Sequence, residues 1–313
     1  MTEPARMPEG RDLLSSGRIV ECVPNFSEGR VAATVDAIAD AISRVPGVVF
    51  LDREMDGDHN RSVLTFVGEP DAVVAAAFLA TAEAARRIDL TRHQGAHPRM
   101  GATDVVPFVP VRGVTTADCV ALAERLGSRI GDELSIPVFL YGDAARVPAR
   151  KNLADVRKGQ FEGLRDLIGK DPDRKPDFGP ERIHPTAGAT AVGARFFLIA
   201  YNVNLKSHDV ALAKSIAKAI REKDGGLPGV RSLGLDLADR GLAQVSMNLV
   251  DYRQTSMATV FREIESRARA AGDEVLESEI IGLVPAEAMR GFRPEDLKLA
   301  RFDPAQQVIE NRL

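Results

Sequence analysis

The segment 92–109 carries the side chains best suited to chemistry. His93 and His97 lie there among glycine and proline residues, which interrupt regular structure, so we predict that both imidazoles are held on a loop. An imidazole titrates near neutral pH and can exchange protons with a substrate. Pro98 restricts the backbone of His97, and the charge of Arg99 disfavours its protonated form. The pattern predicts a neutral base beside a cation, which suits an anionic substrate.

The histidine spacing also raises the question of a metal site. His93 and His97 are four residues apart, as in a helical zinc pair, and His59 lies in an acidic segment. However, Gly95 and Pro98 disfavour the helix that this geometry needs, and no cysteine accompanies the set. We therefore predict no metal ligands and no metal requirement.

Polar residues before an apolar run form a second group of candidates. Asn60 and Arg61 stand at the start of an expected strand, and the planar guanidinium of Arg61 suits a carboxylate. Glu54, Asp56 and Asp58 lie nearby and could orient a histidine or accept an amine. A solvated strand edge explains Asn60 and Arg61 equally well, so the residues alone leave their role open.

The segment 25–29 precedes the first expected helix. Asn25 or Ser27 could cap that helix, with Glu28 in its first turn. The alternative is an anion held at the helix N-terminus. Capping alone explains Ser27, so the sequence does not decide between the two.

The composition bounds the class of protein. The 313 residues suffice for one large domain or two ordinary ones. With 45 acidic and 41 basic residues, the net charge of −4 argues against nucleic acid or membrane surfaces as partners. Cys22 and Cys119 lie in apolar contexts, as expected for reduced thiols of a cytoplasmic protein. Residues 1–17 lack the apolar core of a signal peptide, and we expect a disordered leader there.

Hydrophobic periodicity predicts the same order of elements in both halves of the chain. In the first half we expect strands at 19–23, 48–51, 62–67, 105–109 and 136–141, and helices at 31–43, 70–87 and 116–130. In the second half we expect strands at 195–204, 230–237, 242–250 and 275–284, and helices at 207–223 and 256–271. We predict the α/β class (α+β sandwich type): two lobes, each a mixed β-sheet with helices on one face in β-α-β-β-α-β order.

A polar, proline-rich stretch at 170–187 separates the halves. It is too irregular for a core element and could be a plain linker. The glycines at 179, 188 and 193 allow close backbone approach, which favours a loop that touches a ligand.

Several of these segments together resemble a known family. The similar segments occur in order from about residue 18 to residue 285, and they are 20–30, 58–68, 93–114, 136–146, 177–180, 188–205 and 243–252. They are similar to the formiminotransferase domain of formimidoyltransferase-cyclodeaminase, in the glutamate formimidoyltransferase family. The resemblance implies a standalone form without the cyclodeaminase domain, with an N-terminal subdomain at 18–194 and a C-terminal subdomain at 195–313.

The resemblance implies a one-carbon transferase of the EC 2.1.2 class in histidine degradation. The formimino group would pass from N-formimino-L-glutamate to N5 of the co-substrate tetrahydrofolate, which releases L-glutamate. The histidine of the family's HPRMG motif is the catalytic acid–base and falls on His97, with Arg99, Glu54, Asn60 and Arg61 in support. The folate segment follows DFGP and falls on Gly179, Pro180, Glu181, Arg182, Ile183, His184, Pro185, Thr186, Ala187 and Gly188.

The family is also expected to form a homodimer and to bind folate in a tunnel between two lobes. This chain departs from the family pattern at Glu54 and in the folate segment, which carries His184 and lacks a tryptophan. Arg146 joins Arg61 and Arg99 as a candidate for the carboxylates of the small-molecule substrates. The alternatives are a glutamate formyltransferase that uses 5-formyltetrahydrofolate, and a folate-binding protein without turnover.

Overall fold

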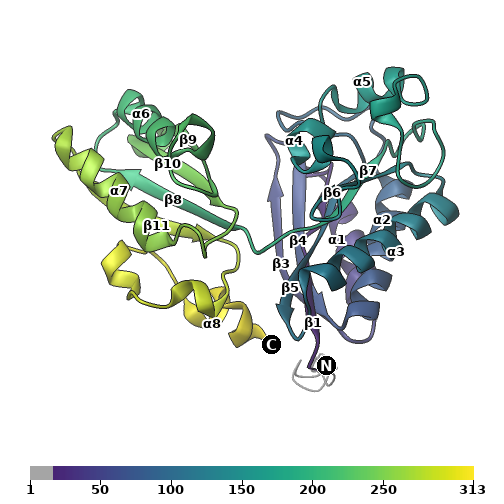
Figure 1. Cartoon of the computed structure of the whole chain (residues 1–313), viewed down its shortest axis with the longest axis horizontal. Helices are drawn as coiled ribbons and strands as arrows, with labels where there is room; N and C mark the ends of the chain where they lie inside the picture. The colour runs from purple at the N-terminus through teal and green to yellow at the C-terminus, as the bar shows by residue number, and fades with distance from the viewer. Residues whose placement is uncertain (1–16) are drawn as a thin grey trace, which may run out of the picture. The chain divides into compact units, whose positions relative to one another are not determined.

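The structure is a computed structural model that describes residues 17–313. The expected leader at 1–17 therefore lies outside the described residues, apart from Gly17. The chain divides into two compact units, unit 1 ending at Arg195 and unit 2 running from Phe196 to Leu313 (Figure 1). None of the described helices combines the length and the apolar character that a membrane span requires.

Unit 1 follows the expected order and adds elements that the periodicity did not predict. Its elements are β1 (Ile19–Cys22), β2 (Asn25–Phe26), α1 (Ala32–Ser43), β3 (Val48–Asp56), β4 (Arg61–Gly68), α2 (Pro70–Arg87), β5 (Thr103–Arg112), α3 (Thr116–Leu134), β6 (Val138–Gly142), α4 (Leu153–Val156), α5 (Gln160–Leu167) and β7 (Thr190–Ala194). The additions are β2, α4, α5 and β7. Each has at most eight residues, too few for a clear hydrophobic period.

Unit 2 also follows the expected order. Its elements are β8 (Ile199–Leu205), α6 (Val210–Ile220), β9 (Val230–Leu237), β10 (Leu242–Leu249), α7 (Met257–Ala270), β11 (Val275–Ile281) and α8 (Pro304–Gln307). Short 3₁₀ turns lie at Pro148–Arg150 and Pro172–Arg174 in unit 1, and at Glu222–Asp224, Ala238–Arg240, Ala286–Met289, Pro294–Leu297 and Ile309–Arg312 in unit 2.

The sheet of unit 1 is mixed, as predicted. Strands β1 and β2 both lie between β4 and β5, and β3 pairs with the other edge of β4. These pairings are antiparallel, whereas β7 pairs in parallel with both β5 and β6. The helix α3 connects β5 to β6, as a crossover between parallel strands requires.

Two apolar clusters cover the two faces of this sheet. The main cluster joins Ile38 of α1, Phe78 of α2 and Leu126 of α3 to the sheet, and Figure 1 shows α2 and α3 along that side. A second cluster on the other face includes Val156 of α4 and Leu164 of α5. The prediction of helices on one face thus needs a correction for unit 1, because α4 and α5 cover part of the opposite face.

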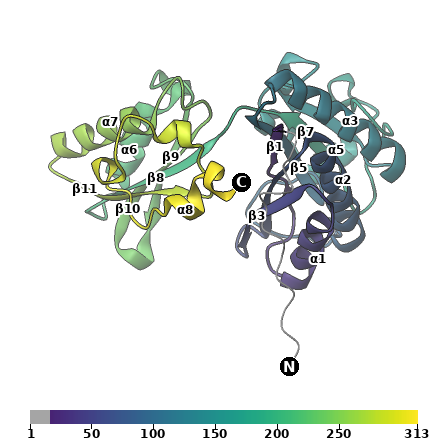
Figure 2. The same ribbon diagram turned by 90° about the horizontal axis from the view of Figure 1, so that it is seen from below.

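The sheet of unit 2 has the order β11-β8-β10-β9, and all its pairings are antiparallel. The prediction of a mixed sheet is therefore wrong for this unit. The two strands that each helix connects do run parallel to each other. They are not neighbours, however, because an antiparallel strand lies between them. Helices α6 and α7 pack side by side on one face (Figure 2). Ser232 of β9 marks that face, because its hydroxyl donates to the carbonyl of Ala217 in α6.

Two strand boundaries differ from the prediction in ways that matter for the site. The first is β3, which runs on to Asp56, so Glu54 and Asp56 pair with Val63 and Arg61 of β4 instead of lying in a loop. The second concerns the expected strand at 195–204, which begins only at Ile199. The preceding residues 190–194 form β7 in the other sheet, where its parallel neighbours hold it.

Candidate active site

The histidine segment forms a loop between α2 and β5, as the glycine and proline pattern predicted. Gly95 brings this loop against the β3–β4 turn, where a Cβ on Gly95 would lie 2.3 Å from the carbonyl oxygen of His59. The backbone N–H of Ala96 also donates to the carbonyl of Asp58, at 3.2 Å. The close approach explains the glycine and places the loop beside the strand pair that carries the polar candidates.

A cavity of about 380 Å³ opens where this loop meets β3 and β4. Three of the predicted residues, Glu54, Arg61 and His97, lie together in its wall. The remaining lining residues are Met55, Asp56, His59 and Val63. The structure therefore assembles a histidine, a guanidinium and carboxylates from segments that are about 40 residues apart in the sequence.

His97 is neutral in this cavity. Its pKa is lowered to about 3, chiefly by burial and then by the charges of Arg61 and Arg157, with a smaller contribution from His59. The sequence analysis predicted a neutral His97 but named Arg99 as the cation responsible. That assignment is wrong, because Arg99 pairs elsewhere and Arg61 and Arg157 supply the charge.

Arg61 is held in place by a neighbouring strand. Its Nε lies 3.0 Å from Oδ1 of Asn25, and a second guanidinium nitrogen bonds to the same oxygen. Asn25 lies on β2, which pairs with β4. Of the two interpretations left open for this segment, capping by Asn25 or Ser27 does not occur, since α1 begins only at Ala32 and the Ser27 hydroxyl donates to the Gly101 carbonyl at 2.7 Å.

Asn60 positions the site and does not line the cavity. It is buried and adopts a left-handed backbone conformation, with φ of 49°. Its Oδ1 accepts from the N–H of Gly29 at 3.0 Å, and its Nδ2 donates to the carbonyl of Gln94 at 3.0 Å. One amide side chain thereby ties the β3–β4 turn to both neighbouring loops.

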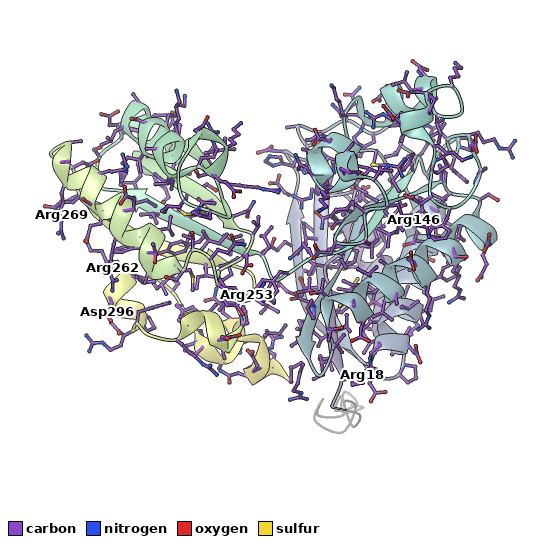
Figure 3. All side chains as sticks on the ribbon, in the orientation of Figure 1. Arg18, Arg146, Arg253, Arg262, Arg269 and Asp296 are labelled. Carbon is purple, nitrogen blue, oxygen red and sulfur yellow. The ribbon has the colours of Figure 1, made fainter. Side chains whose placement is uncertain are left out.

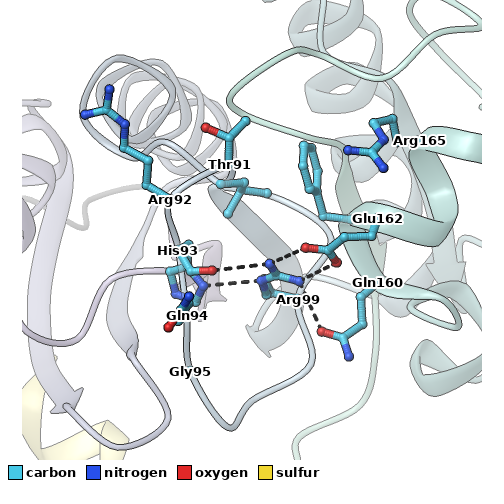
Figure 4. Close-up of a pocket in the computed structure, with 11 residues that line it drawn as sticks. Thr91, Arg92, His93, Gln94, Gly95, Arg99, Gln160, Glu162 and Arg165 are labelled. Atoms are coloured by element: carbon cyan, nitrogen blue, oxygen red, sulfur yellow. Dashed lines mark hydrogen bonds and ion pairs between the residues drawn. The ribbon is translucent and has the colours of Figure 1, made fainter.

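Arg99 and His93 belong to a second cavity of about 600 Å³, shown in Figure 4. Arg99 donates to both carboxylate oxygens of Glu162, at 2.7 and 2.8 Å. Its Nε donates to Nδ1 of His93 at 3.2 Å, so the proton of His93 resides on Nε2 and is donated to the Asn60 carbonyl at 2.9 Å. His93 is therefore a structural link, and Glu162 is a site residue that sequence reasoning missed because α5 was not predicted.

Arg157 and Asp104 form another pair that the sequence analysis missed. The two side chains form an ion pair, and only 14% and 4% of their side-chain surfaces are exposed. Asp104 also accepts from the N–H of Met100 at 2.8 Å, which anchors the end of the histidine loop. A signal was present in the sequence, because an aspartate stands directly before the apolar run of β5.

The expected folate segment divides into two parts. Residues 184–188 form a tight turn in which the His184 and Gly188 backbones pair, and Nδ1 of His184 accepts from the N–H of Ala187 at 2.9 Å. Leu90 and Ala102 lie at the two ends of the histidine loop. Their backbone N–H groups donate to the carbonyls of Thr186 and Ala187, each at 2.9 Å.

The first part of the segment lies against other elements. Gly179 packs against α3. A Cβ at this position would lie 2.7 Å from the carbonyl oxygen of Ile136, so only glycine fits. Glu181 forms an ion pair with Lys175 at 2.8 Å. Arg146, labelled in Figure 3, pairs with Glu124 and stacks over Phe178, so it lines neither of the two cavities.

Within residues 17–313, no group of three or more His, Cys, Asp or Glu side chains is arranged to hold a metal ion. Cys22 and Cys119 are free and buried. Burial raises the pKa of both thiols above the usual value.

Comparisons with known proteins agree with the resemblance. Residues 19–195 match the family model "Formiminotransferase domain, N-terminal subdomain", and residues 200–292 match "Formiminotransferase domain". A glutamate formimidoyltransferase of Streptococcus pyogenes serotype M1 is 47% identical over 296 residues, which cover 95% of this chain and 99% of that protein. A glutamate formimidoyltransferase of Thermoplasma acidophilum is 47% identical over 297 residues, covering 94% of this chain and 97% of that protein.

A bifunctional relative matches over part of its length. The formimidoyltransferase-cyclodeaminase of Mus musculus is 45% identical over 277 residues, which cover 87% of this chain and 51% of that protein. The family expected from the sequence motifs is thereby confirmed. The chain belongs to the formiminotransferase family.

Proposed function

We propose that this protein is a glutamate formimidoyltransferase that transfers the formimino group from N-formimino-L-glutamate to N5 of tetrahydrofolate. The observation that carries the proposal is the cavity in which the neutral His97 faces Arg61 and Glu54. Relatives that the chain matches over almost their whole length carry the name of this activity.

The chemistry of the transfer fits these side chains. A carbon–nitrogen bond forms to N5 while the bond to the glutamate nitrogen breaks, so one proton leaves N5 and one joins the glutamate nitrogen. His97 is neutral and can accept the first proton as a general base. The guanidinium of Arg61 can bind a carboxylate of the donor. Asn60 and the Arg99–His93 link hold the loop that carries His97.

The turn at 184–188 supports a folate site at the histidine loop. Its hydrogen bonds to Leu90 and Ala102 place it along the histidine loop. Tetrahydrofolate bound there is the acceptor in the proposal and would supply the nucleophilic N5. Of the segment Gly179–Gly188 named from the resemblance, we propose contacts for residues 184–188, because Gly179 packs against α3 and Glu181 pairs with Lys175.

Family membership also carries proposals that reach beyond this site. We place the subdomain boundary between residues 194 and 195, and we propose a cytoplasmic homodimer that needs no metal. Chelation followed by buffer exchange should leave turnover unchanged, and loss of activity that Zn²⁺ restores would contradict the metal-free proposal.

The decisive experiment is His97→Gln assayed for glutamate release from formiminoglutamate with tetrahydrofolate. General acid–base residues contribute about 10²–10⁴-fold, so kcat should fall by that order. Tetrahydrofolate affinity, measured by calorimetry, should remain within about threefold of the unmodified protein.

The same assay separates the alternatives. One outcome is that the wild-type protein forms product from 5-formyltetrahydrofolate and glutamate but none from formiminoglutamate and tetrahydrofolate. That result would favour the formyltransferase. Folate binding with no product from either pair would identify a binding protein. Undiminished turnover of His97→Gln would remove His97 from the acid–base role.

A further inference from the structure

A second histidine in the cavity has a carboxylate partner of its own. Nδ1 of His59 lies 2.6 Å from Oδ2 of Asp56. The other oxygen, Oδ1 of Asp56, accepts from the backbone N–H groups of Asp58 and His59 at 3.0 and 2.9 Å. These bonds hold the pKa of Asp56 below its usual range, with the backbone bond from His59 as the largest cause. A lasting carboxylate thus faces Nδ1 and fixes the orientation of the ring.

The geometry places this ring beside His97. The two ring centroids are 6.4 Å apart in an edge-to-face arrangement, and both residues line the cavity of about 380 Å³. Nε2 of His59 makes no hydrogen bond to any residue that the structure describes, so it is available to a bound molecule. The side chain is about half exposed, at 52%, and can exchange protons with solvent.

The two histidines have opposite surroundings. His97 is partly buried and faces the cations Arg61 and Arg157, which disfavour an imidazolium. His59 instead has the carboxylate of Asp56 on Nδ1. Sites that need both a base and an acid commonly separate the two roles in this way.

We propose that His59, paired with Asp56, is a second acid–base residue that donates the proton gained by the departing glutamate nitrogen. The inference rests on the proposed function. His97 takes the proton from N5 as the new carbon–nitrogen bond forms, and the His59 imidazolium gives its Nε2 proton to the glutamate nitrogen as the old bond breaks. His97 then loses its proton and His59 regains one, directly across the cavity or through solvent, so protons balance over the cycle.

Other charged groups also surround His59. They come from the β2–α1 loop, from β3 and its turn, from β4 and from the histidine loop. These groups are Arg30, whose Nε donates to the Gly57 carbonyl at 2.7 Å, and Glu54, Asp56, Asp58, Arg61 and His97.

The test is the pH profile of kcat for His59→Gln and Asp56→Asn with formiminoglutamate and tetrahydrofolate. For His59→Gln we expect kcat to fall by about 10²-fold, with KM values within about twofold and the alkaline limb of the profile lost. For Asp56→Asn the alkaline limb should move to lower pH, because the imidazolium loses its partner charge.

Unit 2 supplies a matched control. Nε2 of His208 lies 2.5 Å from Oδ1 of Asp236, and the two side chains are 48% and 51% exposed, close to the values of the His59 pair. His208→Gln should leave both kcat and the pH profile unchanged.

A His59→Gln profile that superimposes on that of the wild type would overturn the inference while the proposed function stands. Absence of product from the wild type itself would instead overturn the proposed function. A change of the same size in His208→Gln would also contradict the inference, since the effect would then not depend on the cavity.

Discussion

The sheets of the two units share a core order of four strands, β5-β1-β4-β3 in unit 1 and β11-β8-β10-β9 in unit 2. They differ in what stands on the face opposite the long helices. In unit 2 this face carries amides, and Gln244 donates to buried Asn204 at 2.9 Å. The carboxylate of Glu277 there accepts from Asn204 and pairs with Arg240, which holds its pKa low.

In unit 1, ionisable side chains on or near the corresponding face are buried or partly buried, which disfavours their charged forms. Burial raises the pKa of Glu21 to about 7 and lowers that of His97 to about 3. Of its extra elements, β7 extends the sheet beyond β5 and α4 packs on this face of it. A shared strand order therefore does not make a site, whereas partly desolvated charge on that scaffold does.

The first way to test this contrast is to remove a buried ion pair from unit 1. Asp177 bonds to Arg150 at 2.7 Å, with exposed fractions of 7% and 9%, and also accepts from the N–H of Leu140. Asp177→Ala leaves a buried cation without its partner, and we expect the free energy of unfolding to fall by about 3–5 kcal/mol.

The matched variant is Glu277→Ala in unit 2, where Arg240 and Glu277 are 47% and 29% exposed. We expect the free energy of unfolding to fall by at most about 1 kcal/mol when the ion pair with Arg240 is lost. Urea unfolding followed by circular dichroism gives both values. Equal losses in the two variants would mean that burial does not distinguish the units.

The second test uses the buried carboxyl group of Glu21. Its pKa is raised from 4.5 to about 7, so the folded state holds more protons than the unfolded state between those values. Stability from this group is therefore complete below pH 4.5 and is lost as the pH rises to 7. Glutamine does not ionise. The free energy of unfolding of Glu21→Gln should therefore rise relative to that of the wild type by about 3 kcal/mol as the pH increases from 4 to 8.

Denaturation of both proteins across that pH range measures the effect. Glu277→Gln serves as the control, since its pKa is lowered by Arg240 and its contribution has the opposite sign. A constant difference between Glu21→Gln and the wild type would show that Glu21 has the same pKa in the folded and unfolded states.

The third and smallest effect concerns the cation beside His97. Arg61→Gln removes a charge that lowers the pKa of His97, so the acid limb of the profile of kcat/KM should move to higher pH. Loss of a charged contact to the donor should also reduce kcat/KM by about 10- to 100-fold. Arg53→Gln is the control, because Arg53 pairs with Asp36 of α1 and does not line the cavity. An unmoved acid limb would contradict the assignment of Arg61.

The long elements and the histidine loop were predictable because each depends on residues close together in the sequence. The apolar spacing of α2 and the glycines around His97 act locally. The partners of these residues were not predictable. Glu162 reaches Arg99 from 63 positions away, and the short helix that carries it has few periodic positions.

Sequence alone determined the order of the long elements in both units, the loop that holds His97, and the family, because periodicity and contiguous motifs record these directly. Only the tertiary structure decided which cations depress the pKa of His97, that Arg99 pairs with Glu162, and that His59 and Asp56 share the cavity with His97. The physical reason is that burial and charge act through space, and strand pairing between β3 and β4 sets which side chains face one another.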